Sequence, residues 1–284
     1  MSDTTAMSKA ATGEDRSLVA YLMAAFEHRR MIWIAGAKFI RDAHSRTVLG
    51  IWWLIVRALM PTIAIIVILQ HVAVLQEPGL PYALYVTSGM LLWTPLQIGM
   101  RKGVRALTQT ARLTRHFAFP HINAVLAANA ISLVYLAIFT AFFCILLLWY
   151  AMLGDNHVVV SLRLLLVPVI LALFFIFITG VLSVLSVLFV VSKDVRFIMP
   201  ILIHVWFFAT PIVYHLTLLP EKWRAVVLLL NPIANLVVSF RWSLFNMGEW
   251  SPLYFGVTVA EVLVTFLIGA WFMMRAEKAL RIVL

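Results

Sequence analysis

The sequence predicts an all-α polytopic membrane protein. Hydrophobic residues make up 63% of the 284 residues and charged residues only 12%, which leaves too little polar surface to solvate a soluble domain of this size. Apolar runs of about 20 residues, long enough to cross a bilayer as helices, recur along the chain. The Lys and Arg residues gather in a few segments between these runs. Together these observations predict six transmembrane helices in one membrane domain.

The first 50 residues are expected to stay on the cytoplasmic side. Residues 1–16 are polar and carry both signs of charge, with no apolar core behind them, so we expect a flexible N-terminus without a cleavable signal peptide. Residues 17–50 mix apolar side chains with Arg29, Arg30 and Lys38. This composition is typical of an amphipathic helix in the membrane interface. The alternative is a soluble amphipathic cap.

Six apolar segments follow, and together they form the predicted transmembrane domain, 51–274. A strongly basic loop, about 101–121, separates the second span from the third. Within the fourth span, Gly180, Ser183 and Ser186 have the spacing of helix-packing positions. The predicted spans are about 51–74, 81–100, 122–153, 162–190, 197–220 and 252–274.

The segment after the fifth span is too short and too broken to cross the membrane twice. Residues 197–220 form a run of 24 without a charged side chain. Two short apolar pieces then flank Asn231-Pro232. Apolar pieces of about 10–14 residues separated by Pro breaks are typical of re-entrant segments. We therefore predict a re-entrant helical segment over about 221–245, in the outer half of the membrane.

The distribution of positive charge predicts the orientation. With the N-terminus inside, the cytoplasmic segments hold seven Lys and Arg in 1–50, five in 101–115, two in 193–196 and three in 275–281, which is 17 of the 22. Cytoplasmic loops of membrane proteins carry such an excess. Both termini, including a short tail at 275–284, are therefore expected in the cytoplasm. The net charge of +10 is explained by these loops and by anionic lipids, so no nucleic-acid partner is expected.

Motifs for catalysis are absent from the sequence. No phosphate-binding loop, D-x-D pair, nucleophile elbow or His/Cys cluster with metal-ligand spacing occurs. His204 and His215, 11 residues apart, are expected on one face of the fifth span, either packed or as a metal or proton site. Glu261 inside the sixth span must be protonated, paired or next to water. Cys144 is the one cysteine, which excludes an internal disulfide. No catalytic residue, metal or cofactor is therefore expected on this chain.

Six short motifs follow one another along the chain: VLGIWW at 48–53, RHFAFP at 115–120, KDVRFIMP at 193–200, TPIVY at 210–214, LPEKW at 219–223 and NPIANLVVSFRW at 231–242. They occur in the order found in permease subunits of type 2 ABC exporters, and the chain most resembles the branch that exports O-antigen and related polysaccharides. The match covers about residues 40–275. One departure is Ala43-His44, where the family often has an Arg-Tyr pair before its Leu-Gly.

The resemblance implies a homodimer bound to two copies of a separate ATPase subunit, which would hold the ATP and Mg²⁺. The first cytoplasmic loop of such exporters forms a coupling helix. That role maps to residues 107–119 here, with a second contact at the charged turn 193–196. The alternative is a loop that is basic only because it is cytoplasmic. The residues expected at the ATPase contact are Leu107, Arg112, Arg115, Phe117, Lys193, Asp194 and Arg196.

The resemblance also implies a substrate path between the first and fifth spans of the two protomers in the bacterial inner membrane. Aromatic rings there could stack on sugars, or they could be packing and lipid-belt residues. Lys222 and Arg224 at the outer exit would meet a pyrophosphate or lipid phosphate, or only headgroups. The expected path residues are Trp52, Trp53, Trp206, Phe207, Phe208 and Tyr214.

The implied substrate is a lipid-linked polysaccharide of the O-antigen kind. Export of a capsule or teichoic-acid polymer, and then of a drug or small lipid, are the alternatives within this fold. From a different class, the alternative is a membrane-embedded enzyme of glycan assembly.

Overall fold

The computed structural model describes residues 17–42, 50, 52–71, 79–116, 120–154, 161–248 and 250–283, without the side chains of 42, 112–116, 278 and 281–283. The regular elements of this part are helices, which confirms the all-α class. In chain order they are α2 (Leu18–Glu27), α3 (Arg29–Asp42), α4 (Trp52–Leu69), α5 (Tyr82–Gly103), α6 (Ala106–His116), α7 (Ile122–Met152), η2 (Leu162–Leu165), α8 (Leu166–Val191), α9 (Val195–Phe208), η3 (Leu216–Leu218), α10 (Glu221–Leu230), α11 (Pro232–Phe245) and α12 (Pro252–Val283).

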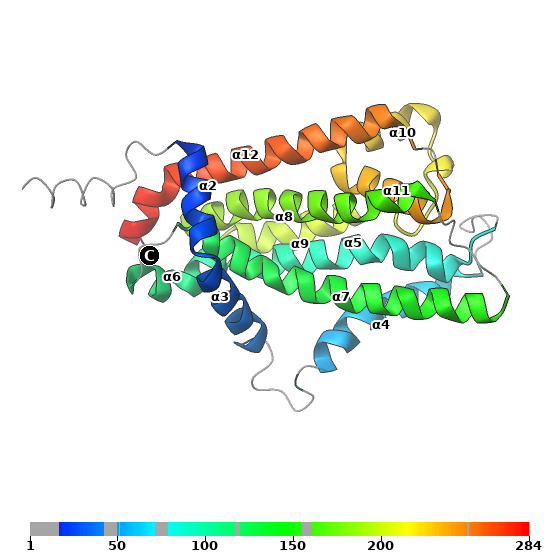
Figure 1. Ribbon diagram of the computed structural model, residues 1–284, viewed down its shortest axis with the longest axis horizontal. Coiled ribbons are helices and arrows are strands. Elements are labelled where there is room, and N and C mark those ends of the chain that lie inside the picture. Colours follow the sequence, from blue (N-terminus) through cyan, green and yellow to red (C-terminus); the bar gives the residue numbers. More distant parts are fainter. Residues whose placement is uncertain are drawn as a thin grey trace, which may run out of the picture.

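The long helices run side by side, and α2 and α3 cross them at one end of the bundle (Figure 1). Within the described part of the chain, four segments are able to cross a membrane by length and composition: α4, α7, η2 with α8, and most of α12. The bent pair α10–α11 would make a fifth if it is one span. The class of a multi-pass helical protein is thereby confirmed, and the count of six spans stays a prediction.

Helix α5 is the centre of the bundle. Of its 22 residues, 17 are buried, because α7, α8, α4, α9 and α11 pack around it. A helix enclosed on every side does not need an apolar lipid-facing surface, and α5 accordingly includes Thr87, Ser88, Thr94 and Gln97. The predicted second span is therefore a deeply buried helix and less apolar than its neighbours.

Helices α8 and α12 approach each other closely through small residues. A Cβ atom built on Gly180 would lie 2.7 Å from the backbone of Phe266, and one on Gly269 would lie about as close to the backbone of Gly180. Ser183 and Ser186 are buried one and two turns further along α8. The prediction that Gly180, Ser183 and Ser186 are packing positions is confirmed.

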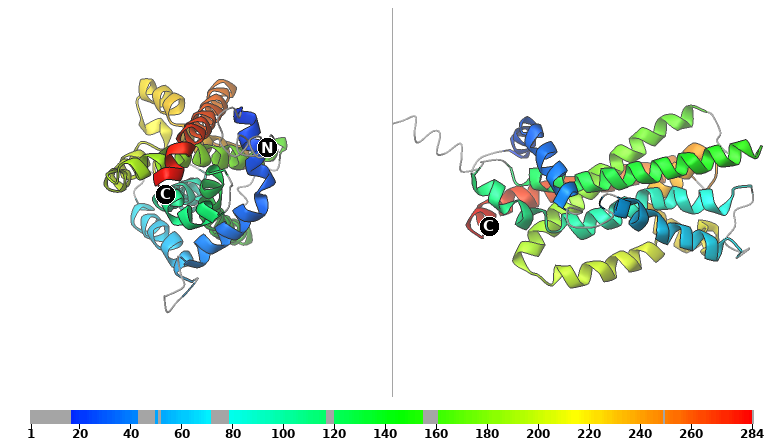
Figure 2. Two further views of the ribbon diagram at one scale, coloured as in Figure 1. Left: turned by 90° about the vertical axis from the view of Figure 1, so that its left-hand side faces the viewer. Right: turned by 90° about the horizontal axis from the view of Figure 1, so that it is seen from below.

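The N-terminal helices are attached to the bundle through buried polar contacts. Tyr21 on α2 is buried, and its hydroxyl accepts a hydrogen bond from the backbone N–H of Ile122 (3.3 Å). Beside it, the ring of His121 lies 3.4 Å from the carboxylate of Glu277 on α12. Helix α3 then crosses α7 (Figure 2). This pair is thus packed on the bundle end rather than separate from it.

The fifth helix is shorter than the sequence indicated. Helix α9 has 14 residues and ends at Phe208, although the charge-free run continues to residue 220. Pro211 lacks a backbone N–H and disfavours helical geometry at Thr210. Thr210 Oγ1 instead donates to the carbonyl of Trp206 (2.8 Å). Beyond it, the chain is irregular up to the short turn η3.

The predicted re-entrant segment is a sharply bent helix pair. Helices α10 and α11 meet at an angle of 103°. Asn231 caps α11, because its Oδ1 accepts a hydrogen bond from the N–H of Ala234 (3.2 Å). Pro232 occupies the first position of α11, where a backbone N–H would have no partner within the helix, so its missing N–H costs nothing there. The bend therefore follows from the Asn-Pro pair that the sequence singled out.

Candidate functional site

The basic segments gather at one end of the molecule. The described parts of α3, α6, the turn between α8 and α9, and the C-terminal part of α12 all lie at the end where α2 and α3 cross the bundle (Figure 1). The segments expected in the cytoplasm therefore share one face, and α10 and α11 lie towards the opposite end. We call this end the basic end.

Helix α6 begins in a tight turn at the basic end. The N–H of Arg105 donates to the carbonyl of Lys102 (3.2 Å), which turns the chain out of α5. Ala106, Leu107 and Thr110 are almost fully buried, and Thr110 Oγ1 donates to the carbonyl of Ala106 (2.8 Å). One face of α6 is thus fixed to the bundle.

The expected ATPase contacts on this helix are only partly located. Leu107 is 1% exposed, so its side chain packs within the chain and does not offer the surface anchor that we expected. The backbone of Arg112 and Arg115 lies in α6, but their side chains and the whole of Phe117 lie outside the described residues. Their role stays a prediction.

The second expected contact lies beside the first. The turn before α9 is closed by Ser192, whose Oγ donates to the carboxylate of Asp194 (3.1 Å) and accepts from its N–H (3.2 Å). Lys193, Asp194 and Arg196 are exposed. Arg196 lines a cavity of about 210 Å³ together with Arg101 and Arg105. Residues about 90 apart in sequence therefore form one positively charged surface.

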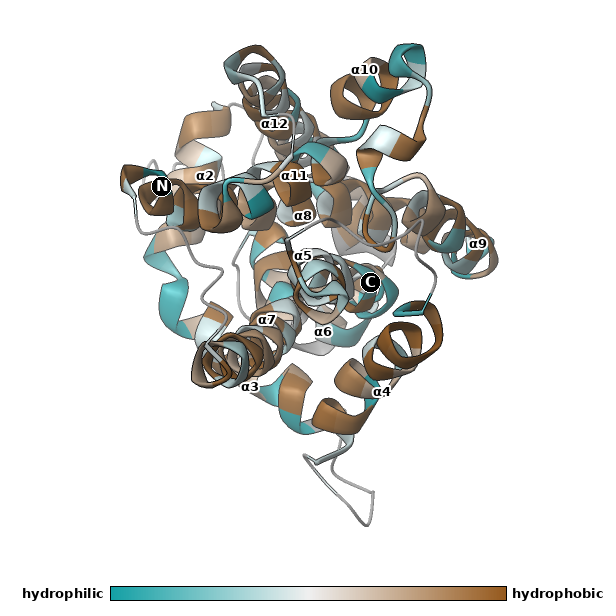
Figure 3. Ribbon diagram, turned by 90° about the vertical axis from the view of Figure 1, so that its right-hand side faces the viewer, coloured by the Kyte–Doolittle hydropathy of each residue, from teal (hydrophilic) through white to brown (hydrophobic). Residues whose placement is uncertain are grey.

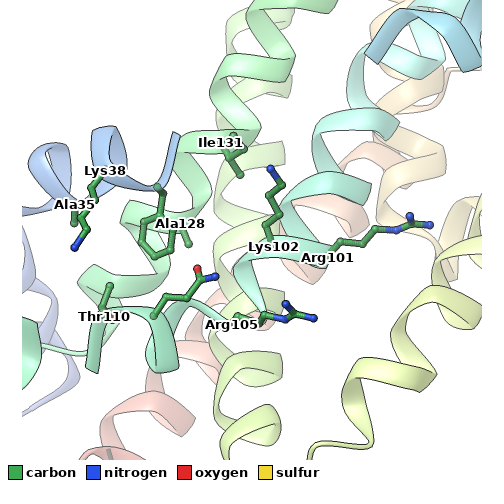
Figure 4. Close-up of a pocket in the computed structure, with 10 residues that line it drawn as sticks. Ala35, Lys38, Arg101, Lys102, Arg105, Thr110, Ala128 and Ile131 are labelled. Carbon is green, nitrogen blue, oxygen red and sulfur yellow. The ribbon is translucent and has the colours of Figure 1, made fainter. Parts of the chain in front are cut away.

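A larger cavity, of about 380 Å³, lies on the other side of the same arginines (Figure 4). It is bounded by α3, the end of α5, the start of α6 and α7. Its polar lining comprises Lys38, Arg101, Lys102, Arg105, Gln109 and Thr110, and its remaining lining comprises Ala35, Phe39, Ala128 and Ile131. Sequence patterning gave no signal for this cavity, because it depends on how α3 crosses α7.

The expected path residues differ in exposure. Trp52 and Phe208 are 64% and 69% exposed. Trp206 and Phe207 are half-buried and contact Trp93 of α5, with ring centroids 6.2 and 5.5 Å apart. The latter two rings act as packing residues within the bundle.

The other two expected path residues make local contacts. Trp53 is half-buried, with the guanidinium of Arg57 5.9 Å from its ring. The hydroxyl of Tyr214 donates to the carbonyl of Phe208 (2.9 Å), so this side chain helps to shape the end of α9.

The two cations expected at the outer exit differ in exposure and in their contacts. Lys222 is exposed, whereas the guanidinium of Arg224 donates to the carbonyls of Leu219 (2.8 Å) and Thr217 (2.7 Å). Arg224 therefore holds the loop before α10.

Arg241 is a buried cation that the sequence interpretation missed. It lies in the predicted re-entrant segment, 221–245, and it is 4% exposed. Its guanidinium donates to the carbonyls of Pro211 (2.7 Å), Ile212 (2.8 Å) and Tyr85 (3.0 Å), while its Nε–H donates to the hydroxyl of Ser88 (3.1 Å). It also lies 3.6 Å from the ring centroid of Tyr85. Arg241 thus joins α11, α5 and the irregular chain after α9.

The two histidines do not share a helix face, so that expectation is wrong. His204 lies on α9, exposed, with its Nδ1 bonded to the carbonyl of Pro200. His215 lies seven residues after the end of α9, buried, with its ring 4.2 Å from that of Tyr85. The break at Pro211 separates them. Among the described residues, no three His, Cys, Asp or Glu side chains could hold a metal ion.

Glu261 is half-buried on α12, as expected from its place in an apolar helix. Its Oε2 is buried and has no hydrogen-bond partner within the described residues.

The apolar helices, the bent pair and the basic end define a multi-pass helical membrane protein. No model of a protein family matches the chain. The chain is similar to the O-antigen export system permease protein RfbA of Myxococcus xanthus, with 24% identity over 220 residues, covering 76% of this chain and 80% of that protein. This similarity confirms the resemblance to O-antigen export permeases.

Proposed function

We propose that the chain is the transmembrane permease subunit of an ATP-driven ABC exporter that moves a lipid-linked polysaccharide of the O-antigen kind across the bacterial inner membrane to its outer side. The observation that carries the proposal is the similarity to an O-antigen export permease over most of both chains. The chain itself would be a transport subunit and not an enzyme.

The basic end supports a partner that supplies energy. Two segments far apart in sequence, α6 and the turn 192–196, lie beside a shared surface of Arg101, Arg105 and Arg196. A cationic surface with a helix fixed to the bundle can transmit motion from a soluble partner into the membrane domain. That partner would be an ABC ATPase, in two copies, with the ATP and Mg²⁺ bound on it.

The exposed apolar faces of α4 and α9 support a dimer of this chain. Both helices lie on the same side of the bundle when it is viewed end on (Figure 3). Their outer residues are largely apolar, as expected for surfaces that contact lipid or a second copy. The exposed large apolar residues are Trp52, Ile55, Val56, Met60, Ile63, Val67 and Ile68 on α4, and Phe197, Ile198, Ile201, Leu202, Val205 and Phe208 on α9.

A substrate path between these faces would be lined by the exposed Trp52 and Phe208 rather than by Trp206 and Phe207. Six spans, with both termini in the cytoplasm, would place the basic end inside. The bent pair α10–α11 would then be re-entrant at the outer side, with Lys222 at the exit.

The coupling part of the proposal is tested by co-purification. Arg112 and Arg115, changed together to Glu, would place like charges against a partner surface that is complementary to the basic end. We expect the variant to insert normally and to lose the ATPase subunit on affinity purification. A Lys222→Glu variant, changed at the opposite end, serves as the control. Retention of the ATPase by the double variant would refute the coupling role.

A further inference from the structure

The strongest unassigned feature is the 380 Å³ cavity between α3, α5, α6 and α7. Four cations border it: Lys38 from α3, and Arg101, Lys102 and Arg105 from the end of α5 and the turn after it. Neither Asp nor Glu is among the described residues that line it, and none of the four makes an ion pair within the described part of the chain. Among the described side chains, positive charge is therefore concentrated there without a compensating carboxylate.

The cations lie on different sides of the cavity. In Figure 4, Lys38 lies on one side and Lys102 on the other, while the guanidinium groups of Arg101 and Arg105 extend away from Lys38. Lys102 is half-buried, and Arg57 on α4 lies close enough for the two charges to repel each other. Like charges held together in this way are stabilised when an anion lies between them.

The rest of the lining indicates an amphiphilic ligand. Ala35, Phe39, Ala128 and Ile131 form an apolar wall, and Gln109 with Thr110 adds hydrogen-bonding groups. The cavity lies where α3 crosses the ends of the long helices, which under the predicted topology is the depth of lipid headgroups. Basic pockets between helices on the cytoplasmic side are suited to phosphate-bearing lipid headgroups.

We propose that this cavity binds the phosphate group of an anionic membrane lipid, which joins α3 to the start of α6. The phosphate lies between Lys38 and Lys102, and the glycerol or acyl part of the lipid lies against Phe39 and Ile131. The lipid would thereby connect the N-terminal helix pair to the helix expected at the ATPase. The phosphate could come from a resident phospholipid or from a polyprenyl carrier lipid. The proposal holds whatever cargo the protein exports.

The test uses native mass spectrometry of the purified full-length chain in detergent. The probes are cardiolipin, phosphatidylglycerol, polyprenyl pyrophosphate, inorganic phosphate and, as the neutral control, phosphatidylethanolamine. The variant is Lys38→Gln with Lys102→Gln. The matched control is Arg30→Gln with Arg275→Gln, which removes two exposed cations outside the cavity, and Lys38→Arg with Lys102→Arg retains the charge.

We expect the Gln variant to bind the anionic lipid roughly 30-fold more weakly, because each Lys near a lipid surface changes the affinity by about a factor of five. The matched control and the Arg variant should bind as the unmodified chain does. Preference for cardiolipin or phosphatidylglycerol would identify a resident phospholipid, and preference for polyprenyl pyrophosphate would identify a carrier lipid.

Three results would overturn the proposal. The first is equal lipid binding by the Gln variant and the unmodified chain. The second is equal binding of phosphatidylethanolamine and the anionic lipids, or binding of inorganic phosphate alone. The third is unchanged lipid binding combined with loss of the ATPase subunit from the Gln variant, which would assign the cavity to an acidic protein partner. Because the readout is lipid retention, failure of this proposal is distinct from failure of export.

Discussion

Arg241 makes four hydrogen bonds to residues 29 to 156 positions away in sequence. Arg241→Met would remove all four from a buried site and take this donor from the carbonyls of Pro211 and Ile212, whereas Ser88 Oγ would still donate to the carbonyl of Tyr85 (2.6 Å). We expect the free energy of unfolding to fall by about 3 kcal/mol, which lowers Tm by roughly 6 °C for a chain of this size. Thermal unfolding of the purified protein in detergent measures it. Lys222→Met, at an exposed position, should leave Tm unchanged, and a Tm of Arg241→Met equal to that of the control would contradict the assignment.

A second prediction concerns the side chain of Asn231. Its Oδ1 accepts from the Trp206 indole (2.9 Å) and from the N–H of Ala234 (3.2 Å), and its Nδ2 donates to Thr210 Oγ1 (2.9 Å) and the carbonyl of Ala209 (3.2 Å). Asn231→Asp keeps the two acceptor roles and loses the two donor roles. Asn231→Ala loses all four contacts, so it should lower the free energy of unfolding by about 2 kcal/mol. The Tm of Asn231→Asp should lie between that of Asn231→Ala and that of the unmodified chain. Equal Tm values for the two variants would show that the cap does not hold the bend.

How far the sequence determines the site can be judged from these two residues. The break at Asn231-Pro232 was recognised because its signal is local: an Asn-Pro pair between two short apolar pieces. The capping contact of Asn231 was not part of that prediction. Arg241 was recognised only as a charge, since its acceptors on α5 and after α9 lie 29 to 156 positions away. A cation near the end of an otherwise apolar helix was the available signal. Its interpretation required the tertiary structure.

At the scale of elements, the contact between α8 and α12 depends on the absence of side chains. Gly180→Ala would place a Cβ 2.7 Å from the backbone of Phe266, so the helices must separate, at a cost of about 1–3 kcal/mol. Gly256→Ala is the matched control, because nothing lies within 4 Å of its Cβ position, and the higher helix propensity of Ala should stabilise α12 by up to about 1 kcal/mol. Tm shifts of the same sign would argue against close packing at Gly180.

Helix positions were predictable because apolar runs and Pro breaks are local signals. Helices occupy all six predicted span positions, and the bent pair begins at Glu221. The end of α9 was placed too late, since the absence of charge was given more weight than Pro211. The central burial of α5 could not be predicted either, because it depends on which helices surround it and not on its own composition.

For the whole molecule, the proposal requires that α4 and α9 face a second copy. Phe208→Cys in a Cys144→Ser background should form a disulfide-linked dimer in native membranes on mild oxidation, because Phe208 is exposed at the end of α9. Leu148→Cys on α7, equally exposed but on another helix, is the control. Cross-linking of the control alone, or of neither variant, would exclude this dimer face.

The central claim is that this molecule exports a finished glycan. It is tested most directly by deleting the chain in its host and measuring lipid-linked glycan in the cytoplasmic and surface fractions separately. The expected result is full-length polymer retained inside and none at the surface. Loss of polymer from both fractions would contradict it and indicate an enzyme of glycan assembly, and unchanged surface polymer would contradict it by showing that the cargo is not this glycan.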